Sequence, residues 1–248
     1  MNTTNDMTSG LKTFAIIGGG LTGTAMLYQL VEKLGRRMKD SSRTHLDLTV
    51  LVFEKQDIFG PGLPHGSRFV LPFHITNMCA KEMSIRWKEP KDFMDWVERH
   101  TLHLQQSVGD PNQAYACPNC RHDGSRHYPR AMMGEYLQDR FRSAVRMAGE
   151  LGVRMELHAR SEVIDLWESD NQIGLTTREA DSSRHRCFQV DGALLATGHW
   201  FPQAQTKNYF TSPWPANALQ QDIPSAETGG GLGSSLSAIE VALTLTAE

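Results

Sequence analysis

The sequence predicts an α/β fold built on a mostly parallel sheet. Two short apolar runs, residues 12–17 and Leu46 to Phe53, have the composition of strands buried on both faces. Between them, Leu21 to Arg37 carries apolar residues at helical spacing. The resulting strand–helix–strand order is typical of a parallel sheet, in which a helix connects neighbouring strands.

A glycine motif joins the first expected strand to the helix. Gly18, Gly20 and Gly23 form the pattern G-x-G-x-x-G, with Gly19, Leu21 and Thr22 between them. The first glycine allows a tight turn, the second lets the backbone approach a pyrophosphate, and the third allows close helix packing. Free N–H groups at the helix start attract phosphate. These six residues are therefore predicted to bind a dinucleotide in a Rossmann-like fold.

An acidic residue ends the second expected strand, as this kind of site requires. Glu54 directly follows Phe53 and is predicted to accept hydrogen bonds from the adenosine ribose, and its neighbour Lys55 is also predicted to contact the cofactor. The usual interval from the motif to the acid is about 20 residues. Here Glu54 lies 31 residues after Gly23, and we expect the polar segment 37–45 to hold the additional residues as a loop.

The rest of the chain alternates between loops, helices and short strands. We expect irregular structure in Gly60–Ser84, Leu102–Arg126 and Gly198–Pro224, which are rich in polar residues, glycine or proline. Helices are expected at Pro90–Arg99, Ala131–Leu151 and Leu236–Ala247. A small β-rich insertion is expected after residue 153, with strands at Val153–His158, Glu162–Glu168, Gln172–Thr177 and Cys187–Leu195.

Composition narrows the classes of function. The net charge of −3 gives no electrostatic reason to expect nucleic acid as a partner. No apolar run reaches the roughly 20 residues of a membrane helix. Residues 1–11 are polar and lack the features of a secretory signal, so we expect a disordered leader. With four cysteines and no such signal, the sequence favours a cytoplasmic protein with reduced thiols.

A C-x-x-C pair is the one hint of a metal. Cys117 and Cys120 lie close to His122 and His127, which leaves a zinc site, a redox pair or two ordinary surface thiols as alternatives. No second C-x-x-C is present and the spacing is unusually tight, so we expect ordinary thiols and no metal site. Neither G-x-S-x-G nor H-E-x-x-H occurs, which leaves hydrolase and metalloprotease functions without support.

Several segments, in order along the chain, resemble a family of bacterial FAD/NAD(P)-binding proteins distantly related to flavin N-hydroxylating monooxygenases. The likeness spans nearly the whole chain. It rests on the glycine motif with Glu54 and on these further segments: Phe59 to Gly66 (FGPGLPHG), Ile75 to Met78 (ITNM), Met83-Ser84, Asp92 to Trp96 (DFMDW), Tyr128 to Arg130 (YPR), Gly134 to Leu137 (GEYL), Leu194 to Gly198 (LLATG) and Gly233 to Glu240 (GSSLSAIE).

The resemblance implies that the dinucleotide is FAD and that Thr197 and Gly198 lie beside it. It also implies that four residues surround the flavin or its substrate, where each either binds a ligand or anchors a loop: His65, His74, Tyr128 and Arg130. The sequence assigns no catalytic acid or base.

A second dinucleotide motif is incomplete. Ser235 stands where its middle glycine is expected, and residues 227–231 (ETGGG) are poor strand formers. We therefore expect residues 12–224 to form the FAD-binding domain and residues 225–248 to begin a truncated or degenerate NAD(P)-binding motif. Any affinity for NAD(P)H should be weak.

Three functions stay open. The first is a flavoprotein oxidoreductase that transfers hydride from NAD(P)H to FAD and on to an unknown small-molecule substrate or oxygen. The second is a non-catalytic FAD- or nucleotide-binding module. A simple NAD-dependent dehydrogenase fits less well, because the Thr197-Gly198 segment resembles flavoproteins.

Overall fold

The computed structural model describes residues 12–40, 46–107, 124–180, 182, 184–199, 206, 209–223 and 227–246, with the backbone alone over 101–107. The chain divides into two compact units. Unit 1 holds residues 1–60 and 138–198, and unit 2 holds residues 61–137 and 199–248. The two units are defined by compactness and not by function. The expected boundary between the FAD-binding domain and the second motif, near residue 224, therefore stays a prediction.

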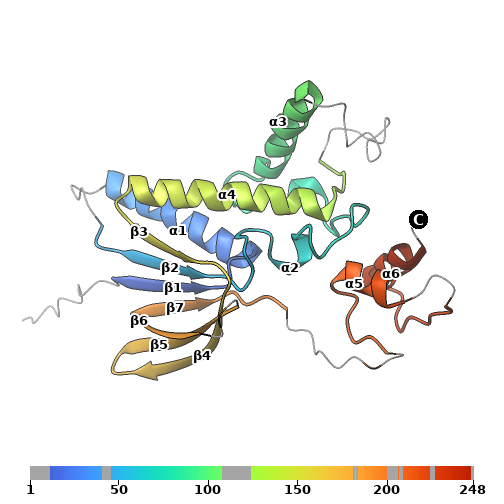
Figure 1. Ribbon diagram of the computed structural model, residues 1–248. Helices are drawn as coiled ribbons and strands as arrows, with labels where there is room; N and C mark the ends of the chain where they lie inside the picture. Colours follow the sequence, from blue (N-terminus) through green and yellow to red (C-terminus); the bar gives the residue numbers. More distant parts are fainter. Residues whose placement is uncertain are drawn as a thin grey trace, which may run out of the picture. The chain divides into compact units, whose positions relative to one another are not determined.

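A four-stranded parallel sheet forms the middle of unit 1 (Figure 1). Its strands are β1 (Thr13–Ile17), β2 (Thr49–Phe53), β3 (Arg154–His158) and β7 (Gly192–Leu195), in the order β3-β2-β1-β7. Ala15 pairs with Leu51 on one side and with Ala193 on the other. The expected α/β class with a mostly parallel sheet is confirmed.

Each face of the parallel sheet is covered by a different layer. Helix α1 (Leu21–Lys39) and the later part of α4 (Arg130–Glu150) cover one face, and an antiparallel sheet covers the other (Figure 1). That sheet has the order β4 (Ser161–Ser169), β5 (Gln172–Glu179), β6 (His185–Val190). Ile17, Phe53, Leu175 and Val190 share the core between the two sheets. Both faces of β1 and β2 are therefore buried, which explains their apolar sequences.

The expected single strand Cys187–Leu195 is wrong, because two strands occupy it. β6 ends at Val190 and belongs to the antiparallel sheet, while β7 begins at Gly192 beside β1. Asp191 marks the change of sheet. Its Oδ2 accepts hydrogen bonds from the Lys12 and Thr13 amides (3.0 and 2.8 Å) and from the Thr13 hydroxyl (2.8 Å).

The β-rich insertion is also smaller than expected. The strand near Val153 is β3, which pairs in parallel with β2, so only β4, β5 and β6 form the separate sheet.

Unit 2 is mostly helical. It contains α2 (Gly62–His65), a 3-10 turn η1 (Ala80–Glu82), α3 (Asp92–Ser107), the first part of α4, α5 (Ala216–Asp222) and α6 (Leu236–Thr246). Helices thus occupy parts of all three segments expected to be irregular, because α2 and η1 lie in the first, α3 continues into the second and α5 lies in the third. These local departures arise where packing outweighs weak sequence periodicity.

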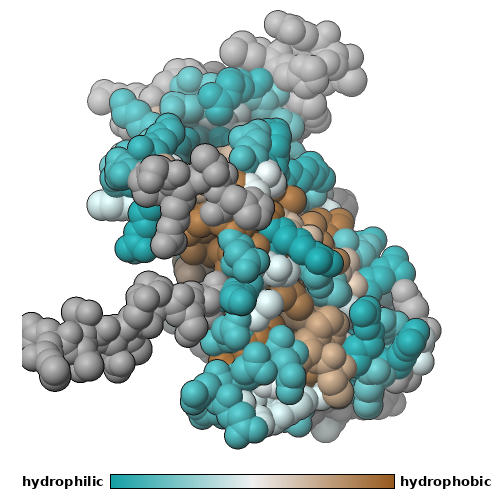
Figure 2. Space-filling model, turned by 90° about the vertical axis from the view of Figure 1, so that its left-hand side faces the viewer, coloured by the Kyte–Doolittle hydropathy of each residue, from teal (hydrophilic) through white to brown (hydrophobic). Residues whose placement is uncertain are grey.

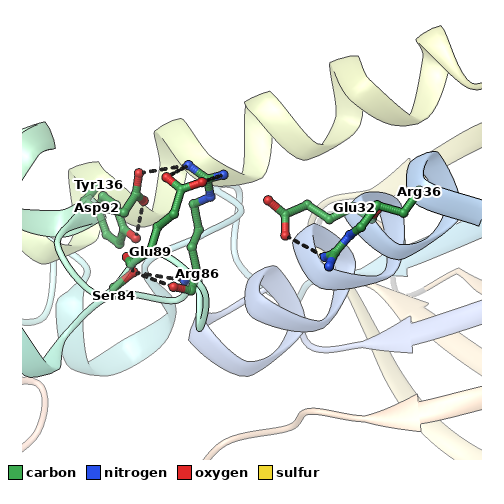
Figure 3. Close-up of polar contacts among 7 residues, drawn as sticks. All are labelled: Glu32, Arg36, Ser84, Arg86, Glu89, Asp92 and Tyr136. Carbon is green, nitrogen blue, oxygen red and sulfur yellow. Dashed lines mark hydrogen bonds and ion pairs between the residues drawn. The ribbon is translucent and has the colours of Figure 1, made fainter. Parts of the chain in front are cut away.

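A network of polar contacts fixes the start of α3 (Figure 3). The buried Tyr136 hydroxyl donates to Asp92 Oδ2 (2.8 Å) and accepts from the Ile85 amide (3.2 Å). Burial, followed by the nearby Asp92 charge, raises the Tyr136 pKa. Arg86 pairs with Glu89 and Asp92, and Phe93 and Trp96 pack their rings against Tyr136. The segments 83–84 and 92–96 therefore form a structural anchor.

On the face seen in Figure 2, hydrophobic residues gather toward the middle and hydrophilic residues lie above and below them. None of the helices in the described ranges combines the length and apolar content that a membrane crossing requires.

Candidate functional site

The predicted dinucleotide site lies in unit 1 at the carboxyl ends of β1, β2 and β7. The glycine motif follows β1, Glu54 follows β2, and Thr197-Gly198 follows β7. Strand order reverses here, because β2 and β3 lie on one side of β1 and β7 lies on the other. In open α/β sheets, the crevice at such a reversal is the usual ligand position.

Gly18 makes the tight turn that its place in the motif requires. Its φ of +105° lies in the left-handed region that favours glycine. A Cβ at this position would lie 2.1 Å from the carbonyl oxygen of Ala196, at the end of β7. The Ala196 amide in turn donates to the Ile17 carbonyl (2.8 Å). The glycine turn and the end of β7 are therefore in direct contact.

Gly23 allows α1 to approach the turn closely. A Cβ at Gly23 would lie 2.0 Å from the Gly18 carbonyl oxygen and 3.1 Å from Ile16 Cγ2. The third motif position thus excludes every side chain through a backbone contact, as the sequence predicts.

Within the described part of the chain, the N–H groups at the start of α1 are not occupied by a side chain. Gly20 is the N-cap, no described side chain caps this helix start, and no acidic residue lies in the first turn. Leu21 and Thr22 are exposed. The N–H groups of a helix start and the positive end of its dipole favour an anion. The geometry therefore fits a pyrophosphate at Gly20 to Gly23.

Glu54 contacts the glycine turn directly. Its Oε2 accepts a hydrogen bond from the Gly19 amide (2.8 Å), and its Oε1 accepts one from the Gln56 amide (2.9 Å). The residue is only 6% exposed. Each carboxylate oxygen can accept more than one hydrogen bond, so both retain capacity for a ribose hydroxyl. Gly19 directs its own N–H to Glu54 and so supports the turn.

The other predicted cofactor residues lie on the exposed side of this site. Lys55, Thr197 and Gly198 are exposed, and Gly198 has a φ of +71°. Ten residues were predicted to bind the cofactor, and unit 1 brings all of them to this end of the sheet.

Arg130 and His74 lie in unit 2, where both contact α6. Arg130 donates from Nε (2.9 Å) and Nη2 (2.6 Å) to Glu240 Oε1, and from Nε to the Ile75 carbonyl (3.1 Å). His74 Nδ1 accepts from the Leu71 amide (3.2 Å), and Nε2 lies 3.0 Å from Thr244 Oγ1. Since Nδ1 accepts, Nε2 carries the proton and donates. For these two residues, the arrangement corresponds to the anchoring alternative.

His65 and Tyr128 also lie in unit 2. Burial, followed by the Arg130 charge, lowers the His65 pKa to about 4, and the buried His65 Nδ1 has no hydrogen-bond partner among the residues that the structure describes. Burial likewise lowers the pKa of His74, which is 1% exposed. The Tyr128 carbonyl accepts a hydrogen bond from the Thr76 amide (2.8 Å), and the Tyr128 ring packs edge-on against the Phe93 ring.

Helix α6 follows the incomplete second motif and exposes an unusual face. No strand occurs in residues 227–235, so the motif lacks the preceding strand that a dinucleotide site needs. The polar Glu240 and Thr244 face the rest of unit 2, whereas the apolar Leu236, Ile239 and Leu243 are 51, 54 and 44% exposed. Polar contacts therefore hold α6 in place.

The metal alternatives cannot be placed. Cys117, Cys120 and His122 lie outside the described residues, as do residues 1–11 with the expected leader. His127 is described, and its Nδ1 lies 2.7 Å from the Thr76 carbonyl oxygen. Across the described ranges, no three His, Cys, Asp or Glu side chains gather in a way that could hold a metal.

Sequence reasoning missed one contributor to the site and one contact at the opposite end of the sheet. Phe59 packs beside Gly19 in the site, whereas Asp191 holds the start of β1 to the segment before β7. The position of Phe59 within the glycine-rich segment after β2 was a usable signal. The Asp191-Gly192 pair was also a usable signal for a turn.

Comparison with known proteins identifies the relatives. A family model described as FAD-NAD(P)-binding matches residues 15–200. A protein of Escherichia coli (strain K12) described as uncharacterized protein YdhS is 25% identical over 237 residues. That match covers 95% of this chain and 39% of YdhS, so the chain spans well under half the length of this curated relative.

Solved structures with partial similarity are longer as well. The cadaverine monooxygenase DfoA of Erwinia amylovora, bound to FAD, has a TM-score of 0.35 and 14% identity over 78% of this chain and 37% of its own. L-lysine 6-monooxygenase of Pseudomonas syringae has a TM-score of 0.39 and 13% identity over 81% of this chain and 38% of its own. The assignment of the chain rests on the family model.

Proposed function

The chain belongs to the FAD-NAD(P)-binding family, and from that premise we propose that it binds FAD as part of a flavin-dependent oxidoreductase. Family membership confirms FAD as the expected cofactor. The observation that carries the proposal is the turn from Gly18 to Gly23, which excludes side chains at its first and last positions and leaves the helix start uncapped.

Different residues of unit 1 bind different parts of the cofactor. The N–H groups at the start of α1, from Gly20 to Gly23, bind the pyrophosphate. Glu54 accepts hydrogen bonds from the adenosine ribose hydroxyls. Lys55, Thr197 and Gly198 line the exposed side of the same site. These roles are proposals that the geometry supports.

FAD, when bound, supplies the redox chemistry, in which hydride from NAD(P)H reaches the flavin and electrons pass on to a small-molecule substrate or to oxygen. The chain binds and orients the cofactor. We assign no catalytic acid or base. A cytoplasmic location and the absence of a nucleic-acid partner remain expectations from the sequence.

The absorbance spectrum of the purified protein tests FAD binding. We expect a yellow protein, or one that turns yellow with added FAD, with the two absorption bands of oxidised flavin. A ligand present at 100 times its Kd stabilises the native state by about 2.7 kcal/mol, so excess FAD should raise the unfolding temperature. A colourless protein that FAD does not stabilise contradicts the proposal.

A second candidate, a non-catalytic FAD-binding module, has support from the second motif. Residues 227–235 contain no strand, and Ser235 occupies the middle glycine position. Both features remove elements that a nicotinamide dinucleotide needs. We therefore expect this 248-residue chain to bind NADH and NADPH weakly, with slow flavin reduction.

Anaerobic mixing with NADPH separates the two candidates. The flavin absorbance of this chain should persist when micromolar NADPH is added, and dithionite provides the control for full reduction. Bleaching within seconds would show that the chain is a working reductase by itself.

A further inference from the structure

Gly19 occupies a position that the motif leaves open, yet its surroundings restrict it. In G-x-G-x-x-G the second residue has no assigned role. Here the Gly19 amide donates to Glu54 Oε2 (2.8 Å). Its carbonyl accepts from the Gly60 amide (2.7 Å) and from the Thr24 hydroxyl (3.3 Å). Both backbone polar groups of Gly19 are therefore held by the chain itself.

The restriction at Gly19 comes from side chains, unlike those at Gly18 and Gly23. Gly19 does not have a positive φ, so its φ gives no reason to require glycine there. A Cβ there would lie 2.6 Å from Phe59 Cδ1 and 3.3 Å from Glu54 Cβ. At Gly18 and Gly23 the nearest atoms are backbone carbonyl oxygens. The ring of Phe59 is thus the principal obstacle to a side chain at position 19.

The Phe59 ring has firm support on its other side. It stacks on Phe141 of α4 with centroids 4.8 Å apart and ring planes 3° from parallel. Phe141 is only 3% exposed, so it cannot easily give way. Gly60, the next residue, donates the hydrogen bond to the Gly19 carbonyl. A ring contact and an adjacent hydrogen bond therefore act on the same residue.

We propose that Phe59 is a positioning residue for the dinucleotide-binding turn, and that its ring, backed by Phe141, closes over Gly19 and fixes the turn in the conformation that receives a pyrophosphate. The expected effect of Phe59 on FAD affinity rests on the proposed FAD binding. The effect of Phe59 on the conformation of the turn does not depend on any ligand. Phe59 acts through Gly19, where its ring leaves too little room for a side chain.

Thermal unfolding of four proteins without added cofactor tests the steric contact. They are the wild type, Gly19→Ala, Phe59→Ala and the double variant. Overpacking against the ring should lower the unfolding temperature of Gly19→Ala by roughly 3–10 °C. In the Phe59→Ala background, the same change should cost less than about 2 °C, because the ring is gone. Phe59→Leu offers the same comparison if the alanine variant does not fold.

Gly18→Ala provides the matched control in both backgrounds. Its clash is with the Ala196 carbonyl oxygen, and its φ is +105°, so removing Phe59 should give no rescue. Equal costs of Gly19→Ala with and without Phe59 would overturn the proposal. Rescue of Gly18→Ala by Phe59→Ala would also overturn it, since the ring would then act only through general stability.

FAD titration tests the positioning role. Phe59→Ala should raise the FAD Kd roughly tenfold, equivalent to about 1.4 kcal/mol. Phe188→Ala removes another aromatic contact of unit 1, with Phe53, and should lower stability while changing the Kd less than about twofold. Equal effects of the two variants on the Kd would refute positioning. If the wild type binds no FAD, the proposed function fails, and the unfolding comparison still decides the steric contact.

Discussion

Glu54 has two roles, because it supports the glycine turn and is proposed to bind ribose. Its carboxylate holds the Gly19 and Gln56 amides in a nearly closed environment. A hydrogen bond to a charged group contributes about 1.5–3 kcal/mol. The support of Gly19 needs no ligand, whereas the ribose contact exists only with FAD.

Replacing Glu54 with Ala should weaken FAD binding by about 1.5–3 kcal/mol and FMN binding by less, because FMN lacks the adenosine ribose. The free protein should also lose stability, since the buried Gly19 amide would lose its acceptor. Isothermal titration with both flavins measures the difference. If the binding of both flavins weakens equally, Glu54 acts only through the glycine turn.

His65 makes unit 2 sensitive to acid. Its pKa is lowered from 6.5 to about 4 by burial and by Arg130, so the folded state binds a proton less readily than the unfolded state. The contribution of neutral His65 to the free energy of unfolding is therefore fully present above about pH 6.5 and is lost as the pH falls toward about 4. At 1.36 kcal/mol per pKa unit, the loss is at most roughly 3 kcal/mol.

Urea unfolding between pH 7 and 4.5 checks this expectation. The midpoint should fall with pH in the wild type and fall less steeply in His65→Gln. The same slope in both proteins would assign the acid sensitivity to other groups, among them His74 and His158, whose pKa values are also lowered by burial.

At the scale of elements, the attachment of α6 to the rest of unit 2 depends on one ion pair more than on apolar burial. The Arg130 and Glu240 side chains are 13 and 12% exposed, with Nη2 and Oε1 2.6 Å apart. The Trp214 ring lies near the guanidinium, and Gln220 donates to the Thr244 carbonyl (2.9 Å). Because such bonds are directional, they fix the rotation of the helix about its axis.

Removing one partner of this pair should destabilise unit 2 by about 2–4 kcal/mol, since a nearly buried charge loses its counter-charge. Glu240→Gln and Arg130→Gln, with the double variant, form the cycle. Arg178 and Glu162 of unit 1 are also 2.6 Å apart but 51 and 44% exposed, so the same changes there should cost less than about 1 kcal/mol. Equal costs for the two pairs in urea unfolding would contradict this ranking.

At the same scale, the sequence predicts elements where the signal is local. The glycine positions could be predicted because strand, turn and helix follow one another within a short segment. The prediction of one strand over residues 187–195 was wrong, since Val190 and Ala193 are both apolar and the break at Asp191 depends on a hydrogen bond to Thr13, far away along the chain. Phe59 was missed for the same reason, because its contact partners lie on α4 and in the turn.

At the scale of the whole molecule, the α/β class and a dinucleotide site follow from the sequence, because a dinucleotide needs the same few backbone features wherever it binds. That the dinucleotide is FAD followed only from the resemblance to the FAD/NAD(P)-binding family. Two helices of unit 2 follow as well, since those expected at Pro90–Arg99 and Leu236–Ala247 correspond to α3 and α6, but α2, η1, α5 and the contacts of α6 do not. Its short helices have weak periodicity, and α6 turns its polar side chains inward, against the usual pattern. Such an arrangement depends on specific partners, here Arg130 and His74, that no periodicity reveals.

The position of β1 between β2 and β7 sets the order in which this sheet can be completed during synthesis. Residues 13–17 and 49–53 leave the ribosome before the long segment that separates them from Asp191 and β7. At 5–20 residues per second, that interval is on the order of ten seconds. Throughout it, one edge of an apolar central strand has no neighbour, which favours aggregation. We therefore expect chaperones that hold nascent chains to engage this protein before residue 192 emerges.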